Sequence, residues 1–362
     1  MDGSLTTPAR ATAAAVPRLG LVLLLGGLAL VLALLAGLLL GPAAVSAAGL
    51  RATLLAAAGL APLPPEFAGD AAVLGVIRGP RVLLAAMLGA GLAVAGATMQ
   101  GLFRNPLADP GLIGVSAGAA LTAVGAIVLG PGLFGARAGV LGLWLLPLAA
   151  FAGGLLATFL IARLGSREGV TSVPTLLLAG VAVNALCAAL TGLLVFAADD
   201  RQVRDITFWT LGSLAGARWP QVPVAAALVL LPALMLMRLA RPLNALALGE
   251  AEAFHLGLRV ERVKRLAVVL AAVAVAAGVA FAGLVGFVGL VVPHLVRLLL
   301  GADHRRVLPG SMLLGAALMV LADLVARWAA APAELPLGVL TALLGAPFFL
   351  WLLRRGAAGG EA

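Results

Sequence analysis

Long apolar runs alternate with short polar segments along the whole chain. Each run has about 20 residues, the length that an α-helix needs to cross a bilayer core of roughly 30 Å. The pattern predicts ten membrane-spanning helices, at residues 19–41, 80–101, 110–130, 140–162, 174–197, 221–239, 266–283, 285–300, 308–328 and 336–353. Gly283 and Gly286 leave room only for a tight turn between the seventh and eighth helices.

The composition agrees with an all-α polytopic membrane protein. Of the 362 residues, 63% are hydrophobic and 11% are charged, and the mean hydropathy is +1.15. The 46 glycines allow helix backbones to approach closely, so we expect about ten tightly packed helices. They would form one domain at 19–355, between an N-terminal tail at 1–18 and a C-terminal tail at 356–362.

A short charged segment at 249–265, GEAEAFHLGLRVERVKR, interrupts the apolar pattern between the sixth and seventh runs. Glu250 favours a first helical turn through the helix dipole, and Gly257 can end that helix in a left-handed conformation. Phe254 and Leu256 would face a surface, and a second helix would run on into the seventh span. The segment predicts a protruding pair of short helices that passes force to a soluble partner; an ordinary solvated loop is the alternative.

The basic residues orient the chain in the membrane. If the N-terminus is cytoplasmic, 16 of the 24 Lys and Arg residues fall in inside segments and 8 in outside segments. Cytoplasmic loops carry the excess of basic residues, so both termini are expected inside. The net charge of +9 then reflects topology rather than nucleic-acid binding, because the basic residues are scattered over loops without interleaved aromatic residues.

The sequence offers no catalytic constellation. The single lysine, Lys264, follows no glycine-rich phosphate-binding loop, so any ATP must be hydrolysed by another subunit. His255, His294 and His304 lie in separate segments without metal-ligand spacing, and the acidic residues are too dispersed for a carboxylate pair. Cys187 is the only cysteine and is expected to be a small buried hydrophobe. We therefore expect neither an enzyme nor a chain that binds a metal or a cofactor.

Ionisable residues are scarce inside the predicted spans. Asp323 is the only acid well inside one, and Arg327, four residues further on the same helix face, can form an ion pair with it. A gradient-driven transporter would need ionisable or ion-coordinating groups at mid-membrane, and it would still work after deletion of the charged segment. An enzyme embedded in the membrane would need paired polar residues. Both classes are therefore disfavoured.

Five stretches carry a resemblance to a known family: RGPR (78–81), GATMQGLFRNPLADPGLIGVSAGAAL (96–121), GFVGLVVPHLVRLLLGADHRRVLP (286–309), ADLVAR (322–327) and ELPLGVLTALLGAPFF (334–349). They resemble the permease family of bacterial iron-complex and cobalamin importers, which are ABC importers of the ten-helix type, over roughly residues 20–355. The resemblance implies a homodimer of two permease copies in the bacterial inner membrane. It also implies two cytoplasmic ATPase subunits that hold ATP and Mg, one periplasmic substrate-binding protein, and no nucleic acid.

The resemblance implies a docking site for the binding protein. Arginines on the periplasmic rim pair with glutamates of the binding protein in the family, and the matching residues here are Arg78, Arg81 and Arg327. Such residues grip carboxylates and steer docking. Snorkelling to the membrane surface is the alternative for Arg78 and Arg81, and Asp323 competes for Arg327.

Two cytoplasmic sites follow from the same resemblance. The charged segment matches the coupling helices that enter a groove on each ATPase, with the contact residues Glu250, Ala251, Phe254, Leu256 and Gly257. The cytoplasmic gate matches two loops, at Asn105, Pro106 and Leu107 and at Thr171, Ser172 and Val173. The Asn-Pro pair also favours a simple turn, and the register of the second gate segment is open by one or two residues.

The substrate class also follows from the resemblance. The amino-acid sequences of 301–309 and 249–257 most resemble those of haemin permeases, with ferric siderophore and cobalamin permeases as the alternatives. A pathway lined by Gly, Ala, Leu and Thr suits a large metal complex without selecting one, so specificity is expected to lie with the binding protein. We predict a haem importer permease and assign no histidine as a ligand of the haem iron.

Overall fold

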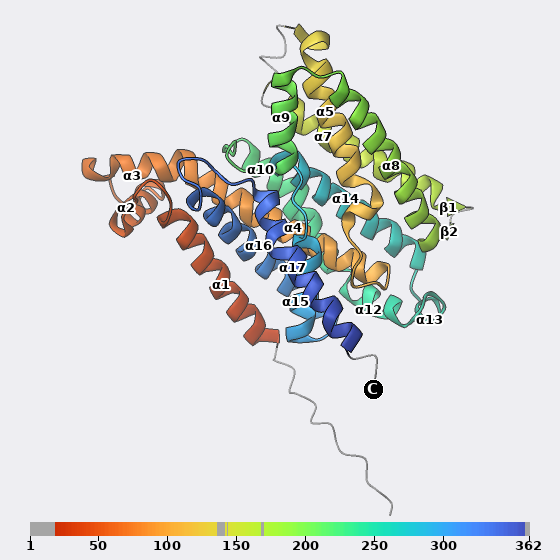
Figure 1. The fold of residues 1–362 in the computed structure, drawn as a ribbon. Helices are drawn as coiled ribbons and strands as arrows, with labels where there is room; N and C mark the ends of the chain where they lie inside the picture. The colour runs from red at the N-terminus through yellow and green to blue at the C-terminus, as the bar shows by residue number, and fades with distance from the viewer. Residues whose placement is uncertain (1–18, 136–141, 143, 168–169, 359–362) are drawn as a thin grey trace, which may run out of the picture.

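The computed structural model describes residues 19–135, 142, 144–167 and 170–358. Figure 1 shows how the elements are arranged. In the first half of the chain they are α1 (Leu19–Leu39), α2 (Ala47–Ala57), η1 (Pro65–Phe67), α3 (Ala68–Ala72), η2 (Val73–Arg78), α4 (Gly79–Leu102), η3 (Pro110–Ile113), α5 (Val115–Phe134), α7 (Leu145–Leu164), the antiparallel strands β1 (Ser166–Arg167) and β2 (Val170–Thr171), and α8 (Val173–Phe196). In the second half they are α9 (Asp200–Leu211), α10 (Gln221–Ala225), η5 (Ala226–Leu230), α11 (Leu231–Met237), α12 (Ala240–Leu248), α13 (Glu250–His255), α14 (Val260–Ala282), α15 (Val288–Leu300), α16 (His304–Trp328) and α17 (Leu337–Ala358).

Each of the ten predicted runs coincides with a helix or a series of helices. Within the described residues, seven helices are long and apolar enough to cross a membrane: α1, the continuous run Pro65–Leu102, α5, α7, α8, α14 and α16. An eighth span results if Gln221–Met237 and the following helix α12, bent by 55°, are counted as one. α15 and the apolar part of α17 are shorter helices. The prediction of an all-α polytopic membrane protein is confirmed.

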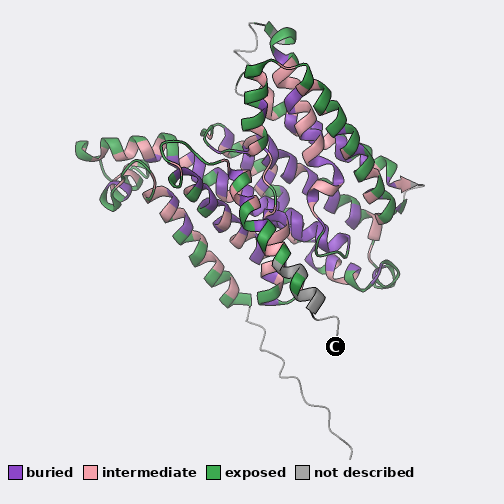
Figure 2. Ribbon diagram, in the orientation of Figure 1, coloured by how far each residue is buried: buried purple, intermediate pink, exposed green. Residues whose placement is uncertain are grey.

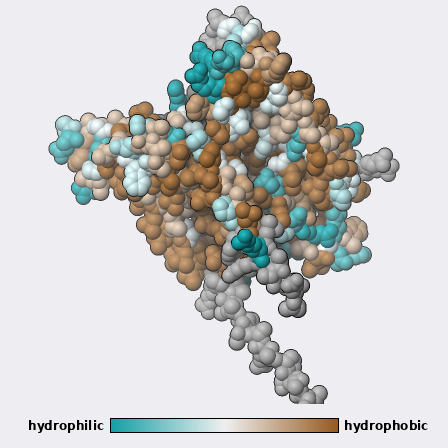
Figure 3. Space-filling view, viewed as in Figure 1, coloured by the Kyte–Doolittle hydropathy of each residue, from teal (hydrophilic) through white to brown (hydrophobic). Residues whose placement is uncertain are grey.

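Burial divides the helices into an inner and an outer set. α4, α14 and α16 form the core and are buried along most of their length, whereas α1 and α8 are largely exposed (Figure 2). Hydrophobic residues cover the middle of the face in Figure 3, and hydrophilic residues gather at its upper and lower right ends. An exposed apolar belt of this kind is expected of helices whose outer surface meets lipid or another subunit.

Glycines bring the inner helices into backbone contact. A Cβ atom on Gly89 of α4 would lie 2.2 Å from the carbonyl oxygen of Gly315 on α16. One on Gly96 would lie 1.9 Å from the carbonyl oxygen of Gly289 on α15. Neither position has room for a larger residue, so the expectation that glycines permit tight packing is confirmed at these two crossings.

The connection between α14 and α15 is a five-residue segment rather than a single tight turn. Gly283 ends α14 with φ of 70°, and Phe287 begins α15 with φ of 66°. The third predicted span also begins later than expected, because Gly114 adopts φ of 83° between η3 and α5.

Helices α2, α9 and α12 were not expected from the apolar pattern. α9 is amphipathic and begins with a capping box, in which the Asp199 side chain accepts from the Gln202 N–H and the Gln202 side chain accepts from the Asp199 N–H. α2 begins similarly at Ser46, whose hydroxyl accepts from the Gly49 N–H at 2.9 Å. Polar cap residues mark α2 and α9 in the sequence where hydropathy does not, whereas α12 begins after Leu239 without a side-chain cap.

Candidate functional site

A buried ion cluster ties together the ends of α4 and α16. Arg81 donates through Nε to both carboxylate oxygens of Asp323, at 2.9 and 3.1 Å. Its two terminal nitrogens each donate to one oxygen of Glu334, at 2.8 Å. Arg327 adds an ion pair from Nε to Asp323, at 3.1 Å, which confirms the expected pairing along α16. We call Arg81, Asp323, Arg327 and Glu334 the arginine cluster.

Arginine side chains also cap the C-terminal end of α1. The last carbonyl groups of an α-helix have no partner within the helix and carry its partial negative charge. Arg327 donates to the carbonyl of Gly37 at 3.1 Å. Arg78 donates to those of Leu38 and Leu39, at 2.6 and 2.9 Å. The outermost helix α1 is thereby fixed to the core at this end.

All three predicted docking arginines are therefore occupied within the chain. Arg78, Arg81 and Arg327 are 2%, 4% and 5% exposed, so in this structure their guanidinium groups neither snorkel to the surface nor lie open for a partner. The carboxylate of Glu334 is the accessible member of the arginine cluster, with a side chain 37% exposed. Hydrogen bonds from Arg81 lower the pKa of Glu334 below its ordinary value. A docking role for the arginines stays a prediction.

The predicted coupling segment forms two helices, as expected. α13 ends at His255, and Gly257 follows its C-cap Leu256 with φ of 83° and donates to the Phe254 carbonyl at 2.9 Å. Phe254 and Leu256 are 69% and 66% exposed, whereas Ala253 is fully buried beneath them. A surface hollow of about 520 Å³ lies between α13 and the start of α14. The segment protrudes from the body of the molecule on the same side as the β1–β2 hairpin in Figure 1, and it exposes the apolar side chains of Phe254 and Leu256.

The first predicted gate segment is a turn. Asn105 accepts through its side chain from the Leu107 N–H at 2.9 Å, and through its carbonyl from the Ala108 N–H at 3.1 Å. Asn105, Pro106 and Leu107 are all exposed. The turn that the Asn-Pro pair favours is confirmed, and it leaves the side chain of Leu107 free to meet another surface.

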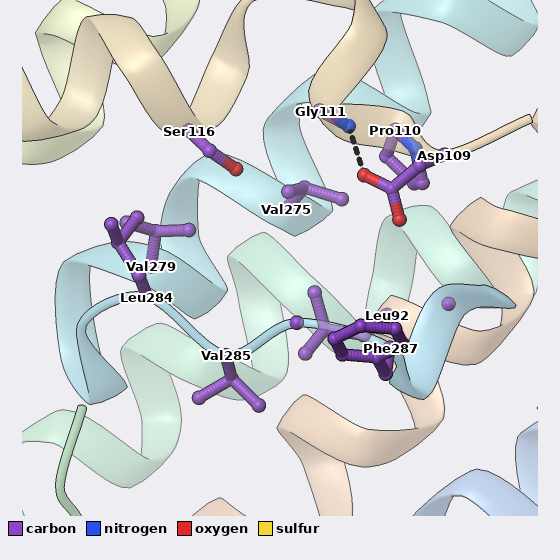
Figure 4. Close-up of a pocket in the computed structure, with 12 residues that line it drawn as sticks. Leu92, Asp109, Pro110, Gly111, Ser116, Val275, Val279, Leu284, Val285 and Phe287 are labelled. Carbon is purple, nitrogen blue, oxygen red and sulfur yellow. Dashed lines mark hydrogen bonds between the residues drawn. The ribbon is translucent and has the colours of Figure 1, made fainter. Parts of the chain in front are cut away.

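A cavity of about 210 Å³ lies behind this turn, between α4, η3, α14 and the 283–287 connection (Figure 4). Asp109 and Ser116 supply side-chain polar atoms to its wall, and valine, leucine and phenylalanine side chains line much of the remainder. Asp109 accepts from the Gly111 N–H at 2.7 Å and so begins η3. The turn at 105–107 is held at both ends, because the Asn105 N–H also donates to the Gln100 carbonyl of α4 at 3.1 Å.

The second predicted gate segment lies at the end of the β1–β2 hairpin. Thr171 is buried in β2, Ser172 is the N-cap of α8, and Val173 is its first residue. The Ser172 hydroxyl accepts from the Thr175 hydroxyl at 3.0 Å, and its N–H donates to the Gly165 carbonyl at 3.1 Å. The hairpin thus sets where α8 begins.

Lys264 joins the predicted coupling and gate segments. Its ammonium donates to Glu250 of α13 at 2.6 Å, to Glu261 of its own helix at 3.1 Å, and to the Thr171 carbonyl at 2.8 Å. The other oxygen of Glu261 accepts from the Thr171 N–H at 3.0 Å. We call Lys264, Glu250, Glu261 and Thr171 the lysine cluster. No spacing in the sequence predicts these contacts, although a single lysine among 24 basic residues is a visible signal.

The long apolar helices can span a membrane. Buried charged residues lie at one end of the helix bundle, and an exposed apolar segment protrudes at the other end. Together these features define a multi-pass transport permease. More particularly, the chain belongs to the FecCD transport family, whose family model matches residues 28–355, and it is a permease subunit of an ABC importer.

Relatives and a solved structure agree with this membership. The chain is 47% identical to the hemin transport system permease protein HmuU of Yersinia pestis over 77% of this chain and 82% of the relative. It is 47% identical to the cobalamin import system permease protein BtuC of Halobacterium salinarum over 78% and 73%. A solved metal-chelate type ABC transporter in an inward-facing conformation matches 93% of this chain and 99% of its own, with a TM-score of 0.80 and 33% identity.

Proposed function

We propose that this permease carries haem from the periplasm to the cytoplasm across the bacterial inner membrane. The observation that carries the proposal is the 47% identity to a hemin transport permease over 279 residues. Cobalamin is the second candidate, because a cobalamin permease matches equally well over 282 residues. A ferric siderophore is the third, by the wider substrate class that the sequence resembles.

The proposed assembly holds two copies of this chain, two ATPase subunits with ATP and Mg, and one periplasmic binding protein. The exposed apolar faces of α1 and α8 support contact with lipid and with the second copy. Both termini would be cytoplasmic, which puts α12, α13 and the β1–β2 hairpin on the ATPase side. The arginine cluster then lies on the periplasmic side.

Docking of the binding protein would exchange one carboxylate for another at Arg81. Glu334 already occupies the two terminal nitrogens of Arg81 in the geometry that a partner's glutamate would take. Because Glu334 is partly exposed and Asp323 is buried, an incoming carboxylate would replace Glu334 and leave the Asp323 contact in place. Arg78 and Arg327 would not contact the incoming carboxylate directly. They would attract it as positive charges near the same surface.

Coupling and gating would occur at the opposite end. Glu250, Ala251, Phe254, Leu256 and Gly257 would seat in a groove of the ATPase, since Phe254 and Leu256 offer exposed apolar surface on a short helix. Bulky charged residues in place of Leu256 and Gly257 should detach the ATPase, measured by co-purification. The turn at 105–107 and the segment at 171–173 would form the gate that opens toward the cytoplasm.

The experiment that tests the function measures ATP hydrolysis by the permease reconstituted with its ATPase and binding protein. Haemin, a ferric siderophore and cobalamin are compared at equal concentration. Stimulation by haemin alone supports the proposal. Stimulation by cobalamin or by the siderophore would instead make that compound the substrate. If none stimulates while the ATPase still co-purifies, the haem assignment fails and the assembly stands.

A further inference from the structure

The only lysine of the chain is buried where three separate elements meet. Lys264 is 2% exposed and donates to α13, to its own helix α14 and to strand β2. A buried ammonium is costly unless its hydrogen bonds are satisfied, so each acceptor matters for the position of the other two. These bonds make the ammonium a junction between α13, α14 and the hairpin.

Two side chains of α14 hold the backbone of a single hairpin residue. Glu261 accepts from the Thr171 N–H, and Lys264 donates to the Thr171 carbonyl, at 3.0 and 2.8 Å. The Ser166 and Thr171 hydroxyls lie 3.0 Å apart across the hairpin. Because Ser172, the next residue, is the N-cap of α8, the position of Thr171 sets the position of the helix start.

The bond to Glu250 makes this arrangement sensitive to the position of α13. α13 has six residues, and Glu250 is its first. The Lys264–Glu250 distance is 2.6 Å, and such a bond is lost when its atoms separate by an additional ångström. The Glu250 side chain is 44% exposed, so water can replace the lysine when α13 shifts.

We infer that Lys264 is a positioning residue that transmits displacement of the coupling helix α13 to the gate segment at Thr171. The inference rests on the proposed roles of α13 and of the 171–173 segment. When the ATPase moves α13, the Glu250–Lys264 contact changes, and Lys264 in turn changes its hold on the Thr171 carbonyl. α8 then moves at its first turn.

The test compares Lys264→Gln, Lys264→Arg and Arg305→Gln in the complete transporter. The glutamine removes the charge, the arginine restores it, and Arg305 provides a matched control because it forms an exposed ion pair with Asp303 at the first turn of α16. Each variant is assayed for ATPase co-purification, basal ATP hydrolysis and uptake of haemin into proteoliposomes. We expect Lys264→Gln to keep the ATPase bound and its basal rate within about twofold, while uptake falls at least about tenfold. Lys264→Arg should recover a third or more of the uptake, and Arg305→Gln should match the wild type.

A second readout does not depend on the substrate. A nitroxide label at Val170→Cys, which is exposed on β2, reports movement of the hairpin in a Cys187→Ala background. ATP with Mg should change its spectrum in the wild type and in Lys264→Arg, but not in Lys264→Gln. This readout separates failure of the inference from failure of the haem assignment.

Three outcomes would overturn the inference. If Lys264→Gln took up haemin as fast as the wild type, Lys264 would not transmit the displacement of α13 to Thr171. Loss of the ATPase in that variant, as expected for changes at Leu256 and Gly257, would make Lys264 a support for α13 only. A spectral change on addition of ATP and Mg in Lys264→Gln as large as that in the wild type would remove the link to the hairpin.

Discussion

The arginine cluster and the lysine cluster use the same ionic chemistry at opposite ends of the molecule, but the central carboxylate of the arginine cluster is buried far more deeply than either carboxylate of the lysine cluster. Glu334, the other carboxylate of the arginine cluster, is 37% exposed. Asp323, at the centre of the arginine cluster, is 1% exposed, and it joins helices α4 and α16 of the core. Glu250 and Glu261 in the lysine cluster are 44% and 28% exposed, and they join a six-residue helix and a hairpin. Water can replace the partner of an exposed carboxylate but not of a buried one. We therefore expect the arginine cluster to hold the fold and the lysine cluster to yield during transport.

The largest effect is expected from Arg81→Met. Removal of this guanidinium leaves Asp323 buried with only Arg327, and loss of one partner of a buried pair costs about 3 to 5 kcal/mol. Thermal unfolding of the detergent-solubilised permease should show a lower midpoint. Arg81→Lys keeps the charge without the bidentate geometry and should lose less. A midpoint equal to the wild type in Arg81→Met would break the comparison.

A smaller loss of stability is expected from Lys264→Gln. The carboxylates that it leaves behind can be hydrated, so the loss should be near that of a single charged hydrogen bond, about 1.5 to 3 kcal/mol. Thermal unfolding of Lys264→Gln and Arg81→Met, measured under the same conditions, gives the ratio of their two losses of stability. If the two variants lost equal stability, the difference in carboxylate burial would not explain the two clusters.

Glu334→Gln sharpens the comparison at the end of the molecule that we propose faces the periplasm. The amide holds Arg81 less tightly than the carboxylate, so a partner's glutamate should replace it more easily. We expect the binding protein to associate about five- to twelvefold more tightly, because a charged hydrogen bond contributes about 1.5 to 3 kcal/mol and the neutral one that replaces it about 0.5 to 1.5 kcal/mol. Surface plasmon resonance with the reconstituted permease measures the affinity. Unchanged affinity would contradict docking by exchange at Arg81.

The smallest effect concerns pH. The pKa of Glu334 is lowered by hydrogen bonds from Arg81, so its folded pKa lies below the ordinary value of about 4.3. The contribution of the Arg81–Glu334 pair to stability is complete above that value and is lost as the pH falls through the folded pKa. The difference in unfolding midpoint between wild type and Glu334→Gln should be constant from pH 7 to pH 5 and shrink below pH 4. A difference that grew on acidification would reverse the sign of the argument.

The apolar pattern was sufficient to predict the fold class and the position of every long helix. It was also sufficient, with Gly257, to predict the shape of the predicted coupling segment, because a glycine after a short amphipathic run commonly ends the helix in the left-handed conformation. Helices α2, α9 and α12 were missed, since short helices outside the spans leave no long apolar run; polar caps mark α2 and α9, but α12 begins after Leu239 without a side-chain cap.

The partners of the charged residues were the part that the sequence could not supply. Arg81 meets Asp323 across 242 positions of the chain and Glu334 across 253, and Lys264 meets Thr171 across 93. The pattern within a helix predicted only Asp323 and Arg327, which lie four residues apart. Long-range pairs depend on how helices cross, and helix crossing here depends on glycine contacts that carry no periodic signal.

The most direct test of the account is ATP-driven uptake of haemin into proteoliposomes that hold the permease, its ATPase and its binding protein, with Lys264→Gln beside the wild type. The account predicts that the wild type accumulates haemin when ATP is present and that Lys264→Gln hydrolyses ATP without accumulating it. A wild type that accumulates cobalamin or a siderophore but no haemin, or a Lys264→Gln variant that imports as well as the wild type, would contradict it.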